Sequence, residues 1–221
     1  MTRLRYINPN STRSMTDKVL AAAQAVRPPT LHIDAATSSS GPPAIQGAAD
    51  GEAALPGLLE EAQRAVAQGS DIIAIACFDD TGMAAVRQAV RVPVIGIGQS
   101  AFLQAMALGR RFSVVTTLAV SVPVIEANLA YCGVAAACAR VRASGVAVLE
   151  LERAGGDAEA RVAAALASAA RQDDVGAVVL GCAGMSDLSE RLQRDAGLPV
   201  IDGVAAAVGV AALIAQRTNR T

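Results

Sequence analysis

The sequence is nearly free of aromatic residues, with no Trp, two Tyr and three Phe among 221 residues. Proteins that bind single-stranded nucleic acid stack its bases on aromatic side chains, so this class of partner is not expected. Duplex nucleic acid requires an excess of basic residues on one face, whereas the 19 Lys and Arg residues are balanced by 20 Asp and Glu residues. We therefore expect no nucleic-acid partner.

Metal-binding and redox motifs are also missing. The chain has one histidine, His32, which leaves no partner constellation for a Ser-His-Asp triad. Its four cysteines include no Cys-x-x-Cys spacing and are too few for a disulfide scaffold in a chain of this length. A zinc site, a thioredoxin-like site and any other metal or organic cofactor are therefore not expected.

No segment resembles a signal peptide or a membrane span. The N-terminal residues Met1–Arg5 run straight into a short apolar stretch that is typical of a strand rather than of a signal-peptide core. The longest run of small apolar residues, 204–215, is shorter than the ~20 residues that span a bilayer. It predicts a buried C-terminal helix. We expect a cytoplasmic protein without a membrane partner.

The abundant feature is apolar sequence, with 52% hydrophobic and 18% charged residues, which is typical of a folded domain with a sizeable core. Short β-branched runs predict buried strands at 4–7, 72–76, 92–97, 112–115, 177–181 and 198–201. Longer Ala-rich stretches between them predict helices at 15–26, 58–68, 83–90, 122–131 and 159–171. This alternation indicates an α/β fold with parallel sheets covered by helices.

The second half of the chain repeats the order of features in the first half. Each half has a strand that ends in a polar cluster, then a strand that ends in a cysteine, then a Pro-Val-Ile segment. The cluster and the cysteine are 69 residues apart from Asn8 to Cys77, and 66 residues apart from Thr116 to Cys182. Chance similarity between strand–helix proteins is the competing explanation, and the shared order and spacing favour duplication.

We therefore predict two pseudo-symmetric lobes, each a parallel sheet flanked by helices, with the active site in the cleft between them. The first lobe is predicted to comprise residues 1–98 and 205–221, and the second residues 99–204.

Cys77 and Cys182 are the candidate catalytic residues. Each follows a predicted strand, and ligands of parallel sheets collect at the carboxyl ends of strands, near helix N-termini. A helix N-terminus there lowers the pKa of a thiol. A single cysteine of this kind is more simply a small buried hydrophobe, but two in equivalent positions favour catalysis.

Two opposed thiols suit the inversion of a carbon that carries a weakly acidic hydrogen. A thiolate removes the proton on one face while a thiol delivers a proton on the other. The enolate formed in between needs hydrogen-bond donors, which backbone N–H groups at the helix starts can supply. This chemistry requires no cofactor.

The polar strand ends are candidates for substrate binding. Asn8 is a candidate both for capping the first helix and for contacting a ligand, whereas Ser11 and Thr12 are expected to cap the helix. For Thr116 and Thr117 the same two roles are open, and ligand contact is favoured.

The loop at residues 38–45 is either a flap over one side of the cleft or a plain surface loop. Asp79 and Asp80 follow Cys77, where their charges would oppose a thiolate, so at least one of them is expected to cap a helix. Cys132 and Cys138 are expected on a helix and in the loop after it, in packing roles.

At these residues the chain resembles the aspartate/glutamate racemase superfamily and, within it, the hydantoin racemases. The matching segments are residues 7–12 (Ile-Asn-Pro-Asn-Ser-Thr), 75–80 (Ile-Ala-Cys-Phe-Asp-Asp), 109–117 (Gly-Arg-Arg-Phe-Ser-Val-Val-Thr-Thr) and 180–185 (Leu-Gly-Cys-Ala-Gly-Met).

The resemblance implies cofactor-independent racemisation by Cys77 and Cys182. Amino-acid racemases of the superfamily usually carry Cys-Asn-Thr at the first cysteine, whereas this chain has Cys77-Phe78-Asp79. That departure disfavours an anionic α-carboxylate and suits a neutral ring such as a 5-substituted hydantoin. The candidates for substrate contact are Asn8, Ile45, Phe78, Asp79, Thr116, Thr117, Ala183 and Gly184.

The resemblance also leads us to expect a homo-oligomer, and having both cysteines argues against the decarboxylases of the superfamily, which keep one. Three alternatives stay open. They are an allantoin racemase, maleate isomerase-like chemistry in which one cysteine adds to a double bond, and a non-catalytic two-lobed protein that binds a small molecule.

Overall fold

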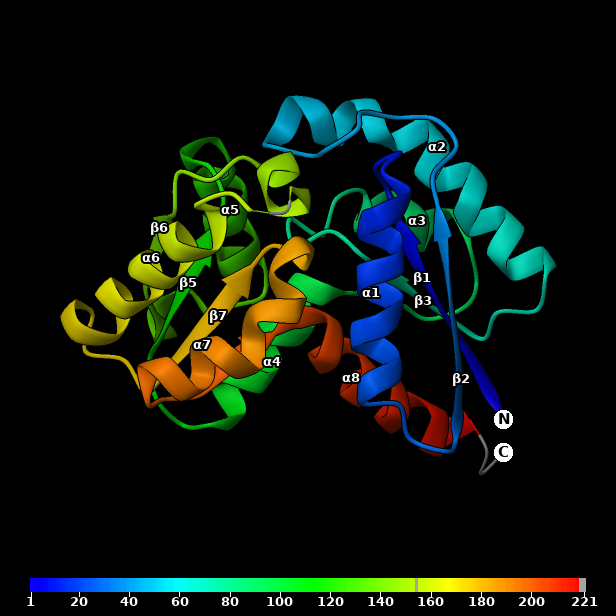
Figure 1. Ribbon diagram of the computed structural model, residues 1–221. Helices are drawn as coiled ribbons and strands as arrows, with labels where there is room; N and C mark the ends of the chain where they lie inside the picture. The colour runs from blue at the N-terminus through cyan, green and yellow to red at the C-terminus, as the bar shows by residue number, and fades with distance from the viewer. Residues whose placement is uncertain (154, 219–221) are drawn as a thin grey trace.

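The computed structural model describes residues 1–153 and 155–218, which form two parallel sheets with the same strand order (Figure 1). The first sheet is ordered β2-β1-β3-β4, with β1 at Thr2–Asn8, β2 at Leu31–Thr37, β3 at Ile72–Ile75 and β4 at Val94–Gly96. The second is ordered β6-β5-β7-β8, with β5 at Phe112–Thr116, β6 at Cys138–Ala143, β7 at Ala177–Gly181 and β8 at Val200–Asp202. The predicted pair of pseudo-symmetric lobes is confirmed.

Helices connect successive strands and cover both sheets. Those of the first half are α1 at Arg13–Ala25, α2 at Ala48–Ala67, α3 at Met83–Ala89 and α4 at Ile97–Ala107. Those of the second half are α5 at Val122–Tyr131, α6 at Ala158–Gln172, α7 at Ser189–Ala196 and α8 at Gly203–Thr218. Short 3₁₀ helices lie at Ala119–Ser121 (η1), Ala135–Ala137 (η2), Val148–Glu152 (η3) and Ala183–Leu188 (η4).

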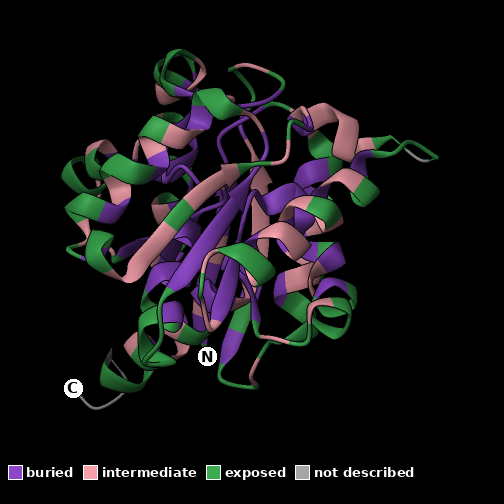
Figure 2. Ribbon diagram, turned by 90° about the vertical axis from the view of Figure 1, so that its left-hand side faces the viewer, coloured by how far each residue is buried: buried purple, intermediate pink, exposed green. Residues whose placement is uncertain are grey.

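The inner strands are buried on both faces, as their β-branched composition predicts. All residues of β3, β5 and β7 are buried, and Figure 2 shows these strands enclosed by helices whose outer faces are exposed. A strand buried on both faces needs no polar side chain, so it appears in the sequence as a continuous apolar run.

The edge strands β2 and β6 are not continuous apolar runs. Both place polar side chains at half-exposed or exposed positions, as in the sequence Cys-Ala-Arg-Val-Arg-Ala of β6. The expectation that Cys138 lies in a loop is therefore wrong, since it begins β6. Cys132 caps the C-terminal end of α5.

The C-terminal helix α8 joins the two halves of the molecule. It packs against α4 and also contacts α1, and the Tyr6 hydroxyl on β1 donates a 2.8 Å hydrogen bond to the Val204 carbonyl oxygen. The predicted boundary between residues 98 and 99 lies inside α4, and residues 154 and 219–221 of the predicted lobes lie outside the described residues. The division into lobes at these residues stays a prediction.

Candidate functional site

One cavity lies between the carboxyl ends of the two sheets, and both candidate cysteines line it. Cys77 follows β3 and Cys182 follows β7, which hold the same position in the two sheets. Cys77 is partly buried and Cys182 is 9% exposed. The space between the lining atoms is about 360 Å³, a figure that includes space open to solvent.

Most of the predicted substrate contacts lie on this cavity. Its lining includes Ile45, Phe78, Asp79, Thr116, Thr117 and Ala183, together with Met15 and Val148. The structure therefore brings residues from both lobes to one small space. That they touch a substrate stays a prediction.

Asn8 and Gly184 do not line the cavity. The Asn8 amide nitrogen donates to Asn10 Oδ1 at 2.9 Å, and its Oδ1 accepts from the Asn10 backbone N–H at 3.2 Å, so Asn8 closes the loop after β1. Asn10, the next polar side chain in that loop, lines the cavity instead. Asn8 and Asn10 belong to the same polar cluster in the sequence, and nothing in the sequence indicates which of the two side chains faces the cavity.

The two sulfur atoms have matching hydrogen-bond environments. Each sulfur accepts a hydrogen bond from the backbone N–H two residues further on, Asp79 for Cys77 and Gly184 for Cys182. The Thr81 hydroxyl also donates to the Cys77 sulfur at 3.3 Å. These donors stabilise a thiolate, as the strand-end position predicts.

The expectation that this setting lowers the pKa of both thiols is nevertheless wrong. Burial is the largest effect, and it raises the pKa of Cys77 well above its usual range and that of Cys182 to about 12. The nearby carboxyl of Asp79 raises both further. The N–H donors act in the opposite direction and are outweighed.

Asp79 lies in the cavity beside both thiols. Burial raises its pKa to about 7, which hydrogen bonding from the Ser121 hydroxyl only partly offsets. Its Oδ2 atom is buried and has no hydrogen-bond partner among the described residues. This carboxyl is therefore close to half protonated near neutral pH.

Asp80 caps a helix, as predicted for one of the two acids. Its Oδ1 accepts from the Gly98 N–H at 2.9 Å and its Oδ2 from the Gln99 N–H at 2.7 Å, at the start of α4. The helix that follows it in sequence, α3, receives no side-chain cap. Asp80 thus ties the loop after Cys77 to the segment that connects the lobes.

The loop before α2 closes one side of the cavity. Ser11 and Thr12 do not cap α1 as expected, because their hydroxyls bond carbonyl oxygens of this loop, with Thr12 Oγ1 donating to Pro43 at 2.6 Å. Further along, Ile45 lines the cavity and the Gln46 side-chain oxygen accepts from the Val148 N–H at 2.9 Å. This arrangement is consistent with the flap expected there.

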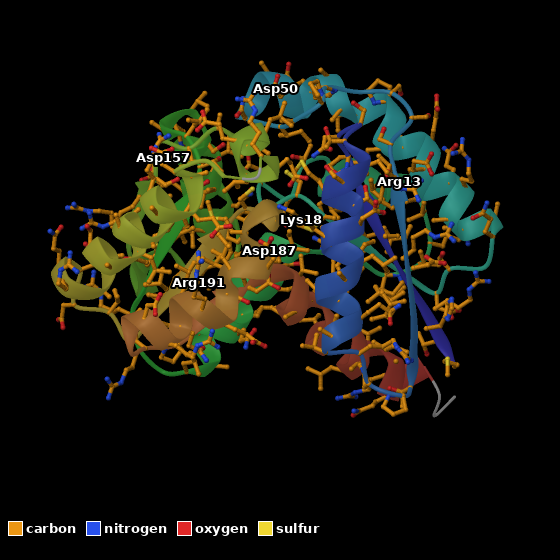
Figure 3. The ribbon with its side chains drawn as sticks, viewed as in Figure 1. Arg13, Lys18, Asp50, Asp157, Asp187 and Arg191 are labelled. Carbon is orange, nitrogen blue, oxygen red and sulfur yellow. The ribbon has the colours of Figure 1, made fainter. Side chains whose placement is uncertain are left out.

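Charged side chains hold α1 against the second lobe above Cys182. Lys18 Nζ lies 3.0 Å from Glu152 Oε1 and 3.6 Å from Asp187 Oδ2, and it donates to the Leu151 carbonyl oxygen at 3.0 Å. Figure 3 shows Lys18 and Asp187 facing one another across the gap between α1 and η4. Lys18 lowers the pKa of Cys182, an effect smaller than that of burial.

Within residues 1–153 and 155–218, no group of three or more His, Cys, Asp and Glu side chains is placed to hold a metal ion. In the same part of the chain, no helix has the length and apolar character needed to cross a membrane.

Comparisons with known proteins agree with this geometry. The family model described as Asp/Glu/Hydantoin racemase matches residues 4–211. A hydantoin racemase from Rhizobium meliloti is 46% identical over 94% of this chain and 86% of its own length.

Two solved structures are similar throughout. Allantoin racemase from Klebsiella pneumoniae has a TM-score of 0.94 and 39% identity, covering 98% of this chain and 89% of its own. Allantoin racemase from Pseudomonas fluorescens has a TM-score of 0.89 and 35% identity, covering 99% and 91%.

Proposed function

Because this chain belongs to the Asp/Glu/Hydantoin racemase family and is an isomerase, we propose that it racemises 5-substituted hydantoins at C5 with a pair of cysteines and no cofactor. The observation that carries the proposal is the presence of Cys77 and Cys182 on one cavity at equivalent strand ends. A non-catalytic binding protein would have no need of two matched thiols.

The reaction proceeds in two proton transfers. The thiolate of one cysteine removes the C5 proton and becomes a thiol, leaving an enolate whose charge lies on the ring oxygen. The thiol of the other cysteine then delivers its proton to the opposite face and becomes the thiolate. The other enantiomer uses the two residues in exchanged roles.

Thiolate formation is opposed by burial and by the Asp79 carboxyl, which raise the pKa of both thiols. The hydrogen-bond donors to the sulfur atoms favour the thiolate. They are the backbone N–H groups of Asp79 and Gly184 and the Thr81 hydroxyl. Only one of the two cysteines has to ionise in each turnover.

The lining of the cavity favours a neutral ring over an amino acid. Among the described residues, no Lys or Arg lines it, so an α-carboxylate finds no cation there. Met15, Ile45 and Val148 add apolar surface suited to a hydrocarbon substituent at C5. Allantoin, a hydantoin with a polar substituent, is the second candidate, because the two similar structures are of allantoin racemases.

The test is a single enantiomer of a 5-substituted hydantoin incubated with the protein in heavy water. We expect optical rotation to fall to zero while deuterium appears at C5. Cys77→Ala and Cys182→Ala are each expected to abolish racemisation of both enantiomers, whereas Cys132→Ala, which lies outside the cavity, is expected to leave it intact. Racemisation by either active-site variant contradicts the two-cysteine assignment.

A panel of hydantoins, allantoin and free amino acids separates the substrate classes. We expect the highest kcat/KM for hydantoins with an apolar substituent, and no racemisation of free amino acids. A higher kcat/KM for allantoin selects the second candidate.

The homo-oligomer and the cytoplasmic location remain proposals. Leu103, Met106 and Leu108 on and after α4 are exposed apolar side chains, which a second copy would cover. Sedimentation of the purified protein measures the oligomeric state directly.

A further inference from the structure

Asp79 carries an unsatisfied polar atom into the cavity. The residue is 9% exposed and lines the same space as both cysteines, and its Oδ2 has no hydrogen-bond partner among the described residues. An unpaired buried carboxyl oxygen costs ~1–3 kcal/mol or more, so a native protein keeps one only where something else binds it.

The backbone around Asp79 is held firmly, so the unpaired oxygen is not a result of a loose loop. The Asn128 side chain on α5 donates to the Asp79 carbonyl oxygen at 2.7 Å. The Asp80 N–H donates to the Cys77 carbonyl oxygen at 3.0 Å, and the Asp80 carboxylate is anchored on α4. These contacts fix the side of the cavity from which Oδ2 reaches a ligand.

Among the described residues, no charged group that faces Asp79 favours its ionised form, and the Ser121 hydroxyl, which does favour it, is outweighed by burial. In the described part of the chain no Lys or Arg forms an ion pair with Asp79. The charge of Asp79 raises the pKa of Cys77, Cys182 and Asp80. All three become anions on losing a proton. When one cysteine is a thiolate, a second anion at Asp79 is therefore disfavoured.

We propose that Asp79 acts as a neutral carboxylic acid in the reacting complex, and that its Oδ2–H donates a hydrogen bond to the ring carbonyl oxygen next to the reacting carbon. This inference rests on the proposed racemase function. The Asp79 proton stays on Asp79 throughout. One cysteine takes the C5 proton, the carbonyl oxygen gains negative charge, and the other cysteine returns a proton to C5.

The hydrogen bond strengthens as charge grows on the oxygen, which lowers the barrier to enolate formation. It also defines the substrate class as a neutral ring with a carbonyl group beside the reacting carbon. An α-carboxylate substrate brings its own negative charge to a cavity that already contains a thiolate and no cation, so it is excluded.

The protonation state is tested with a ligand that cannot react, a hydantoin with two methyl groups at C5. Infrared difference spectra of the wild-type protein at about pH 8, above the Asp79 pKa of about 7, are expected to show a carboxylic-acid carbonyl band on binding. The band is expected to be absent in Asp79→Asn and present in Asp80→Asn, whose substituted residue does not line the cavity. A wild-type complex that shows only the carboxylate overturns the inference.

Kinetics give the second readout. Removing one donor to a developing oxyanion costs ~10²–10³ in kcat, so Asp79→Ala is expected to lose that factor. Asp79→Asn keeps an N–H donor of similar size and is expected to lose ~10-fold or less. Wild-type kcat in Asp79→Ala overturns the inference.

The two proposals fail in different ways. A wild-type protein that does not racemise any hydantoin ends the proposed function and this inference with it. A wild-type protein that racemises hydantoins while Asp79 is ionised in the complex ends this inference alone.

Discussion

Replacing Asp79 by Asn is expected to change the stability of the fold in a pH-dependent way. Burial raises the pKa of this carboxyl from its usual 3.8 to about 7. Because the folded-state pKa lies above that of the unfolded chain, the ionised carboxyl destabilises the fold. This cost is absent below pH 3.8 and is complete above about pH 7.

The size of the effect follows from the pKa difference. One pKa unit corresponds to ~1.4 kcal/mol, so ionising Asp79 in the folded protein costs about 4 kcal/mol. Asn cannot ionise, and the gain of Asp79→Asn over wild type is therefore expected to be about 4 kcal/mol larger at pH 8 than at pH 4. For a chain of this length, this corresponds to a relative shift in Tm of about 8–16 °C.

The assay is thermal unfolding of both proteins across this pH range. Any penalty for burying the new amide is the same at every pH, so the change with pH isolates the ionisation of Asp79. Asp195→Asn, at an exposed position on α7, is the control and is expected to show a small shift. A difference between Asp79→Asn and wild type that stays constant with pH refutes the raised pKa.

Further variants test the scaffold of the site. A methyl group at Gly98 would lie 2.3 Å from the Phe78 carbonyl oxygen, so Gly98→Ala is expected to displace the loop after Cys77 and to reduce both Tm and kcat. At Gly209 on α8 nothing lies within 4 Å of such a methyl group, so Gly209→Ala is expected to raise the free energy of unfolding by about 0.5–1 kcal/mol. Lys18→Met removes the ion-pair partner of Glu152 and a cation that favours the Cys182 thiolate. Alkylation of Cys182 by iodoacetamide, followed by mass spectrometry, is therefore expected to be slower, and an unchanged rate contradicts this role of Lys18. Tyr6→Phe loses the hydrogen bond to the Val204 carbonyl oxygen and is expected to lower the free energy of unfolding by about 1–2 kcal/mol in urea, and no change would show that this contact does not hold α8.

Structural features that depend on residues close together in the chain can be predicted from the sequence. The inner strands β3 and β7 are continuous apolar runs because both of their faces are covered, and β5 departs from this pattern at Ser113 and Thr116. The two strand-end cysteines are visible because the chain repeats. The edge strand β6 is half exposed, so its alternating sequence does not stand out as an apolar run.

Features that depend on packing between distant segments were not predicted. Asp80 caps α4, which begins 17 residues further on, rather than the adjacent α3. The direction of the thiol pKa shifts depends on how much of both lobes covers each sulfur, which no local motif reveals. Whether Asn8 or Asn10 faces the cavity depends on the turn after β1.

The most direct test of the two-cysteine account is the isotopic composition of substrate and product early in the reaction. One enantiomer of a 5-substituted hydantoin is incubated with the wild-type protein in heavy water. At low conversion the two enantiomers are separated, and the deuterium content of each is measured by mass spectrometry. If one thiol removes the proton and the other delivers a solvent-derived one, the inverted product carries deuterium while the remaining substrate keeps its hydrogen. Deuterium appearing equally in the unreacted enantiomer would show that a single base serves both faces and would contradict the account.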